Sequence, residues 1–294
     1  MSTRAEEQIR ADIVEVGRRL YTRGFVASND GNISARLDDR RLVTTPKSVS
    51  KGFMTPDMMV IVDLDGAKLA GDRDPSSELP MHLEIYRQRP DVNAVVHAHP
   101  PTATGFAVAG IPLTRAVLAE VVTTLGSIPI VEYGTPSTRE LADTVKPYVK
   151  AHDGLLLANH GALALGPDLF AAYYRMETIE HFARISLTAR LLGREHLLSR
   201  DEVVRLQNLR GSYGIASPAP ICPDPVPVTA GADPTCQVVQ APASSASRLV
   251  PDTSVAAGPG RVSIGTDGEI RLTYAQLTEL IDEAVRQLGG SFNG

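Results

Sequence analysis

Tryptophan is absent from this chain of 294 residues, aromatic residues make up only 5% of it, and cysteine occurs twice. No apolar run approaches the roughly 20 residues that a helix needs to cross a bilayer, so we expect no membrane-spanning segment. Acidic residues outnumber basic ones, giving a net charge of −5, and no basic cluster that would bind nucleic acid is present. Neither a membrane nor a nucleic acid is therefore an expected partner.

The N-terminus and the two cysteines bear on localisation. Residues 1–20 are charged and amphipathic and lack the apolar core of a signal peptide, so we expect a cytoplasmic protein. Cys222 and Cys236 are too few for a disulfide scaffold. We expect them to be free thiols with no part in the functional site, with a regulatory or crosslinking role as the alternative.

The most informative stretch is the apolar segment that leads into His97 and His99. Side chains alternate along a strand, so both imidazoles are expected on one face. A second apolar strand, beginning at Leu155, leads to His160, which is followed by glycine. Three imidazoles at two strand ends are typical of a catalytic zinc site, in which the fourth position stays open. Taken alone, the His-x-His pair has a polar strand end as its alternative interpretation.

A second informative stretch is Ser76-Ser77-Glu78, which precedes an amphipathic helix. Two hydroxyls and the free N–H groups of a helix N-terminus can bind an anion, or the serines can simply cap the helix. Glu78 in the first turn suits the helix dipole, and it can also serve as a metal ligand or general base.

Three further segments contain candidate groups. Asn32 lies in a turn and can direct its amide at an anion. The loop 47–52 contains two lysines and can donate hydrogen bonds to a phosphate or carboxylate, with a solvated loop as the alternative. Glu120 stands between apolar neighbours, which indicates a paired carboxylate or an acid–base group.

Four motifs occur in order along the chain: Asn32-Ile33-Ser34-Ala35, Pro75-Ser76-Ser77-Glu78 with His82 and Tyr86 after it, His97-Ala98-His99, and Asn159-His160-Gly161. With these motifs at these separations, residues 5–214 resemble the class II aldolases of the L-fuculose-phosphate and L-rhamnulose-phosphate type, within the wider aldolase II/adducin family. The motifs are specific for the family and much less specific for the substrate.

The resemblance implies an α/β fold of three layers, α/β/α, around a mostly antiparallel sheet. It implies a homotetramer of C4 symmetry with active sites between subunits. One Zn²⁺ per subunit, or another divalent metal, would be bound by His97, His99 and His160. Glu78 would be the fourth ligand and then the proton-transfer base. The substrate phosphate would be held by Asn32, Thr45, Lys47, Ser48, Ser76 and Ser77.

The same resemblance implies a reaction, the zinc-dependent retro-aldol cleavage of a ketose 1-phosphate. L-fuculose or L-rhamnulose 1-phosphate would give dihydroxyacetone phosphate and lactaldehyde. Tyr213 is similar to a C-terminal tyrosine that such aldolases place in a neighbouring subunit's site. Either Tyr213 or Glu120 would handle the proton on the aldehyde oxygen.

One position departs from the family pattern and keeps alternatives open. In Thr45-Pro46-Lys47-Ser48 a serine replaces a glycine that lets the backbone approach the phosphate, although Lys47 can restore charge. A carboxylate-bearing substrate is therefore an alternative. The family also includes hydroxy-carboxylate decarboxylases and pentulose-phosphate epimerases, as well as non-catalytic adducin-like scaffolds.

The end of the chain differs in composition from the aldolase-like domain, which we place at 1–214. Residues 215–260 contain nine prolines and no aromatic residue, which predicts an extended linker. In residues 261–294 we expect a small hairpin over 261–272 and an amphipathic helix over 273–288. A short helix on such a linker resembles the encapsulation peptides of bacterial microcompartment cargo. Shell proteins are then expected partners, and a helix folded back on its own tetramer is the alternative.

Overall fold

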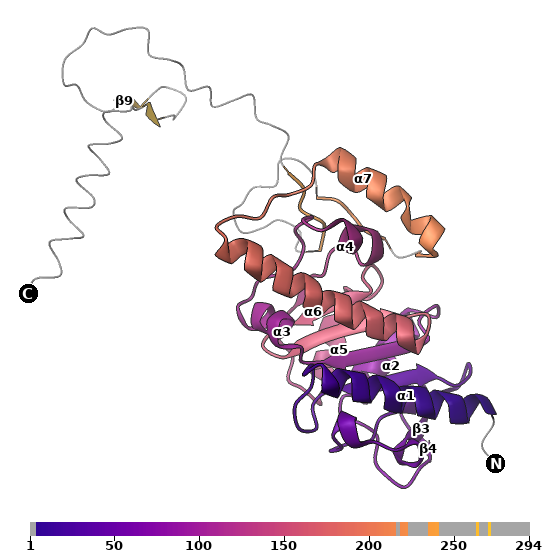
Figure 1. Cartoon of the computed structure of the whole chain (residues 1–294). Coiled ribbons are helices and arrows are strands. Elements are labelled where there is room, and N and C mark those ends of the chain that lie inside the picture. Colours follow the sequence, from indigo (N-terminus) through magenta and orange to yellow (C-terminus); the bar gives the residue numbers. More distant parts are fainter. Residues whose placement is uncertain (1–3, 216–217, 223–234, 241–262, 265–269, 272–294) are drawn as a thin grey trace, which may run out of the picture. The chain divides into compact units, whose positions relative to one another are not determined.

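The computed structural model describes residues 4–215, 218–222, 235–240, 263–264 and 270–271 (Figure 1). The chain forms two compact units, Met1–Pro242 and Ala243–Gly294, and each is described by itself. None of the described helices is both long enough and apolar enough to span a bilayer.

An eight-stranded sheet forms the centre of the first unit, in the order β4-β3-β2-β1-β5-β8-β7-β6. Neighbouring strands are antiparallel except β6 and β7, which run parallel. The strands are β1 (Asn32–Arg36), β2 (Arg41–Thr44), β3 (Val60–Asp63), β4 (Lys68–Ala70), β5 (Ala94–Ala98), β6 (Ile130–Val131), β7 (Gly154–Leu157) and β8 (Gly161–Gly166).

Helices cover both faces of this sheet. One apolar cluster joins it to α1, α3 and α6, and Figure 1 shows α1 and α6 crossing the near face. A second cluster joins the opposite face to α2 and α5. The expected three-layer fold around a mostly antiparallel sheet is therefore confirmed. The α-helices are α1 (Arg4–Thr22), α2 (Leu79–Gln88), α3 (Pro101–Val108), α4 (Ala119–Thr124), α5 (Arg139–Val145), α6 (Leu169–Leu191) and α7 (Arg200–Asn208), and the 3₁₀ helices are η1 (Lys51–Phe53), η2 (Pro56–Met58) and η3 (Arg210–Tyr213).

The alternation of side chains along β5 determines the face on which its histidine lies. Val96 packs in the cluster with α1, α3 and α6, whereas Val95 packs in the opposite cluster with α2. His97 is therefore directed to the α2 face, because successive strand residues point to opposite sides. Glu78 immediately precedes α2, so the carboxylate and the strand histidine belong to the same layer.

Local sequence signals define the ends of two helices. Asp168 is the N-cap of α6, and its side chain accepts a hydrogen bond from the Ala171 backbone N at 2.8 Å. Ser199 is the N-cap of α7 and forms a capping box with Glu202. The apolar strand that leads to His160 is β7, and it pairs antiparallel with β8.

The described residues of the segment expected to be a linker pack on the first unit. Val239 lies in a small apolar cluster with Val122 of α4 and Val203 of α7. The backbone of Val238 pairs with that of Arg115. The compact unit extends beyond the expected boundary at 214, and an extended chain is wrong for these residues.

Cys222 and Cys236 form a disulfide bond, so the expectation of two free thiols is wrong. Both residues are buried, and their Cα atoms are 5.0 Å apart. The bond joins residues 14 positions apart in the sequence and thereby fixes the packed part of the segment. Composition alone did not predict this pairing, because it depends on how the segment folds against α4 and α7.

Replacing both cysteines by alanine should loosen this segment more than the rest of the unit. A crosslink across a loop of this length contributes roughly 3 kcal/mol in the chain-entropy model. Hydrogen exchange at residues 235–240 should become faster in the double variant, while exchange in β5 stays unchanged. Equal exchange at 235–240 in the oxidised protein and the double variant would contradict a stabilising role of the bond.

In the second unit, β9 (Ser263–Ile264) pairs antiparallel with β10 (Ile270–Arg271). This pair confirms the hairpin expected over 261–272. The amphipathic helix expected over 273–288 lies outside the described residues.

Candidate metal centre

Three imidazoles meet near the ends of β5 and β7. His97 lies on β5, His99 follows that strand, and His160 lies in the turn between β7 and β8. The ring centroids are 4.7 to 5.0 Å apart. Each ring offers one nitrogen to a common point, and these three nitrogens all lie within 4.8 Å of one another. The fold thus brings together the three residues that the sequence singled out.

The turn that contains His160 is tightly packed. Asn159 adopts a left-handed φ of 55°, which asparagine tolerates better than most residues. A Cβ atom on Gly161 would lie 2.6 Å from the carbonyl oxygen of Ala98 and 2.6 Å from Cδ2 of His99. The absence of a side chain at Gly161 therefore allows the two strand ends to approach until their histidines meet.

Replacing Gly161 by alanine should push the strand ends apart and weaken metal binding about 10- to 100-fold. Overpacking against atoms that cannot move freely costs about 1–3 kcal/mol. Gly105→Ala on α3 is the matched control, because an added Cβ there meets nothing within 4 Å. The measurement is zinc affinity in competition with a chelator. Equal affinities for the two variants would contradict the required close approach.

The carboxylate of Glu78 lies among the histidines. Its Oε2 is 3.3 Å from Nε2 of His97, and its Oε1 is 3.2 Å from Nε2 of His160. Asn32, which lies opposite His97 in the β1–β5 pair, donates a hydrogen bond from Nδ2 to Oε2 at 2.7 Å. The amide that we expected to face a bound anion thus orients this carboxylate.

The protonation states of these groups favour cation binding. Burial lowers the pKa of His97 well below its ordinary value. Burial, followed by the charge of His160, also lowers the pKa of His99. Burial opposes ionisation of Glu78, but the neighbouring imidazoles and the amide hydrogen bond hold its pKa below the usual range. The lowered pKa values of His97 and His99 favour neutral imidazoles near neutral pH, and that of Glu78 favours a carboxylate, which are the states that bind a metal.

The positions of the nitrogens fit one cation. Nδ1 of His97 donates to the carbonyl oxygen of Ala162 at 2.9 Å, which leaves the lone pair of Nε2 free. The Nε2 atoms of His97 and His99 face each other at 3.1 Å. Two nitrogens on one tetrahedral zinc are roughly 3.3 Å apart, since each Zn–N bond is about 2.0–2.1 Å. A shared cation would relieve the repulsion between these lone pairs.

Two loops beside Glu78 contain most of the residues expected to hold a phosphate. The backbone N of Ser76 donates to the Thr45 carbonyl at 3.1 Å, and that of Lys47 donates to the Asp74 carbonyl at 2.9 Å. These bonds place the two loops side by side. The Thr45 hydroxyl itself is buried and accepts a hydrogen bond from the backbone of β1, so it stabilises the loop.

The two serines of the second loop lie before the helix cap. We expected them at the N-cap of α2, but the helix begins at Leu79 with Glu78 in the cap position. Ser76 Oγ accepts a hydrogen bond from the Glu78 backbone N at 3.3 Å. Ser77 Oγ accepts one from Ser137 at 2.8 Å and is exposed. Ser76 and Ser77 therefore directly precede Glu78, but neither serine is the N-cap of α2.

Neither Glu120 nor Tyr213 contacts the histidines within the described part of the chain. Glu120 is exposed in the first turn of α4, where it lines a hollow together with Arg23 and His181. Tyr213 ends η3 with 66% of its surface exposed.

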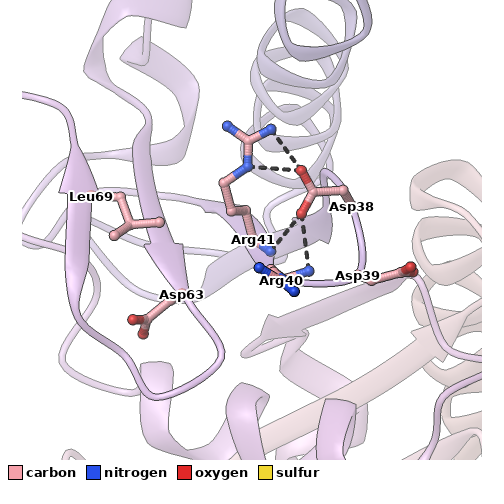
Figure 2. Close-up of a pocket in the computed structure, with 6 residues that line it drawn as sticks. All are labelled: Asp38, Asp39, Arg40, Arg41, Asp63 and Leu69. Atoms are coloured by element: carbon pink, nitrogen blue, oxygen red, sulfur yellow. Dashed lines mark hydrogen bonds and ion pairs between the residues drawn. The ribbon is translucent and has the colours of Figure 1, made fainter.

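A separate hollow lies towards the β4 edge of the sheet and contains none of the predicted site residues. Asp38 and Arg41 form an ion pair at 2.6 Å within it. Figure 2 shows its lining residues, Asp38, Asp39, Arg40, Arg41, Asp63 and Leu69.

Lys51, in the loop 47–52, was not identified from the sequence as a candidate site residue. It is only 2% exposed, whereas Lys47, which was chosen instead, is exposed. The only sequence signal for Lys51 was its position in a loop with two lysines. The sequence does not indicate which of the two lysines is buried.

Comparisons with known proteins agree on one family. The profile of the Class II Aldolase and Adducin N-terminal domain matches residues 11–187. The 3-oxo-tetronate 4-phosphate decarboxylase of Pectobacterium atrosepticum is 31% identical over 211 residues, covering 70% of this chain and 95% of the relative. The 5-deoxy-D-ribulose 1-phosphate aldolase of Bacillus thuringiensis serovar kurstaki is 35% identical over 208 residues, covering 70% and 96%.

A solved structure of an L-fuculose 1-phosphate aldolase has the same fold. It superposes with a TM-score of 0.65 at 28% identity, over 71% of this chain and 97% of that chain. The region matched by the family profile includes Glu78 and the three histidines. The chain therefore belongs to the class II aldolase and adducin family and is one of its metal-dependent lyases.

Proposed function

We propose that this protein is a zinc-dependent aldolase that cleaves a ketose 1-phosphate into dihydroxyacetone phosphate and lactaldehyde. L-fuculose 1-phosphate and L-rhamnulose 1-phosphate are the proposed substrates. The observation that carries this proposal is the convergence of three imidazoles and Glu78 on one point. The adjacent pair of polar loops supports a phosphate-bearing substrate.

Each part of the centre has a task in the retro-aldol reaction. The C4 hydroxyl loses its proton, the C3–C4 bond breaks, and an electron pair remains on C3. A zinc ion held by His97, His99 and His160 supplies Lewis-acid stabilisation of that charge. Glu78, oriented by Asn32, is the base that takes the proton from C3 in the condensation direction, and in cleavage the protonated Glu78 returns that proton to C3. The loops hold the phosphate, so that remote binding places the reacting carbons beside Glu78.

A neighbouring subunit completes this site in the proposed C4 homotetramer. Its Tyr213 or Glu120 handles the proton on the aldehyde oxygen, since both residues are exposed. Sedimentation should give a mass of four chains of 31.4 kDa each. Full turnover by a monomer would contradict this arrangement.

The direct test of the activity is dihydroxyacetone phosphate release from each proposed substrate by zinc-loaded protein. Release should require the metal and should be lost after chelation. No release from either sugar phosphate would contradict the aldolase proposal.

The second candidate is metal-dependent decarboxylation of a phosphorylated oxo- or hydroxy-acid. The relative from Pectobacterium atrosepticum supports it, as does Ser48, which replaces the glycine of the aldolase loop. The same centre would stabilise the charge left when CO₂ departs. Release of CO₂ from 3-oxo-tetronate 4-phosphate, with no cleavage of either ketose 1-phosphate, would favour this reaction, since loss of CO₂ from that acid itself leaves dihydroxyacetone phosphate. Epimerisation of a pentulose phosphate would give neither product, and an adducin-like scaffold would lack stoichiometric zinc.

For the tail we propose an encapsulation peptide within 261–294 that takes the enzyme into a bacterial microcompartment in the cytoplasm. Support comes from the apolar sequence stripe that includes Tyr274, Leu277 and Ile281, and from the reactive aldehyde product. Deleting 261–294 should leave turnover intact and abolish association with shell proteins. A fall in turnover would favour a helix that folds back on its own tetramer.

A further inference from the structure

Lys51 joins two segments that lead to the proposed phosphate site. Its Nζ donates to the carbonyl oxygen of Asn29 at 2.9 Å and to that of Val49 at 2.8 Å. Asn29 lies in the turn before β1, and Val49 directly follows Ser48. One buried ammonium therefore fixes the turn before β1 and the first polar loop relative to each other.

Close packing holds Lys51 in this position. A Cβ atom on Gly17 of α1 would lie 2.7 Å from the backbone oxygen of Lys51, so α1 lies directly against η1. The ring of Tyr21 occupies the space that a side chain on Gly52 would need. The stem of Lys51 is thus enclosed, and the residue is 2% exposed.

Lys51 forms no ion pair within the described part of the chain. Burial lowers its pKa to about 8, while the charges of Asp30 and Glu78 act on it through space. The ammonium form therefore still predominates at neutral pH. Buried charges in proteins are normally paired. An ammonium also has three donors, of which the two carbonyls use two. An unpaired charge with a remaining donor is suited to an anionic ligand.

The residue before Lys51 provides an independent observation. Oγ of Ser50 is buried and has no hydrogen-bond partner among the described residues. A buried hydroxyl without a hydrogen-bond partner destabilises the folded protein, unless a ligand or water forms a hydrogen bond with it. The unpaired charge and the unpaired hydroxyl belong to adjacent residues of the same loop.

We propose that Lys51 and Ser50 form the floor of the phosphate site, where the ammonium selects a phosphate group and the hydroxyl donates to it. The location of this site rests on the proposed function. Lys51 compensates for Ser48, whose side chain keeps the backbone farther from the phosphate than glycine would.

The test is binding of inorganic phosphate to the zinc-loaded, full-length protein, measured by calorimetry at pH 7. Lys51→Met removes the charge and keeps most of the stem, and Lys150→Met, at an exposed lysine outside the two loops, is the control. We expect Lys51→Met to weaken phosphate binding 10- to 100-fold, as the loss of a charge-assisted hydrogen bond does. Ser50→Ala should weaken it about 5- to 10-fold. Lys150→Met should change it less than about twofold.

Zinc content and thermal unfolding show whether each variant is folded and loaded. Unchanged phosphate affinity in zinc-loaded Lys51→Met would overturn the proposal. If Lys51→Met does not fold, the phosphate affinity of Ser50→Ala tests the proposal instead. A wild-type phosphate affinity in Ser50→Ala would overturn the proposal. KM for the substrate should rise in both variants while kcat changes little, which separates substrate binding from a general loss of structure.

This design also separates the present inference from the proposed reaction. Inorganic phosphate binding is measured without turnover, so an enzyme with a different phosphorylated substrate would still depend on Lys51. An active aldolase whose KM and phosphate affinity do not depend on Lys51 would keep its proposed function and refute the role of this residue.

Discussion

Replacing Glu78 by glutamine should lower kcat about 100- to 10,000-fold, the usual contribution of general acid–base catalysis. Glutamine keeps the shape of the side chain, and its amide oxygen can still accept the hydrogen bond that Asn32 now donates at 2.7 Å. It cannot, however, carry a proton to C3. The measurement is steady-state turnover at saturating substrate, with zinc content determined on the same sample.

The matched control for this variant is Glu84→Gln on the same helix. Glu84 accepts a hydrogen bond from Gln88 at 2.9 Å and lies 3.7 Å from Lys146, away from the histidines. Its substitution should leave kcat within about twofold of wild type, since the pair with Lys146 is partly exposed. A zinc-loaded Glu78→Gln protein with wild-type kcat would refute the proton-transfer role.

Replacing His97 by alanine should abolish stoichiometric metal binding and, with it, turnover. His97 is fully buried, so its loss removes one ligand and leaves a cavity next to the other two. Losing only an outer partner of a ligand costs about 10- to 100-fold in metal affinity, and losing the ligand itself should cost more. Elemental analysis after dialysis against a weak chelator measures the zinc bound per chain.

His196→Ala is the control for a general effect of removing an imidazole. His196 is exposed in the loop before α7 and is not part of the cluster. This variant should retain one zinc per chain and wild-type turnover. Stoichiometric zinc in dialysed His97→Ala would show that the metal binds elsewhere.

The histidine cluster could be predicted because each of its parts depends on local structure. Strand alternation is enough to place His97 and His99 on one side, and the glycine after His160 indicates the turn. Glu78 was identified from the start of an amphipathic helix. The family motifs, which resemble those of known aldolases, then connected segments that are distant in the sequence.

The remaining features depend on tertiary packing. Lys51 is buried because α1 lies against η1 at Gly17, and the loop sequence contains no sign of that contact. The disulfide bond between Cys222 and Cys236 depends on a segment whose composition is typical of a linker. Glu120 was expected to be paired or catalytic because of its apolar neighbours, but it is exposed at the start of α4, where Leu118 and Val121 line the same hollow.

The most direct test of the account is X-ray absorption at the zinc edge of the purified full-length protein. We predict one zinc per chain with three imidazole nitrogens at about 2.0–2.1 Å and one oxygen ligand from Glu78. Glu78→Gln should alter only the oxygen contribution. Absence of stoichiometric zinc, or a first shell with fewer than three imidazoles, would contradict the centre on which the proposed reaction depends.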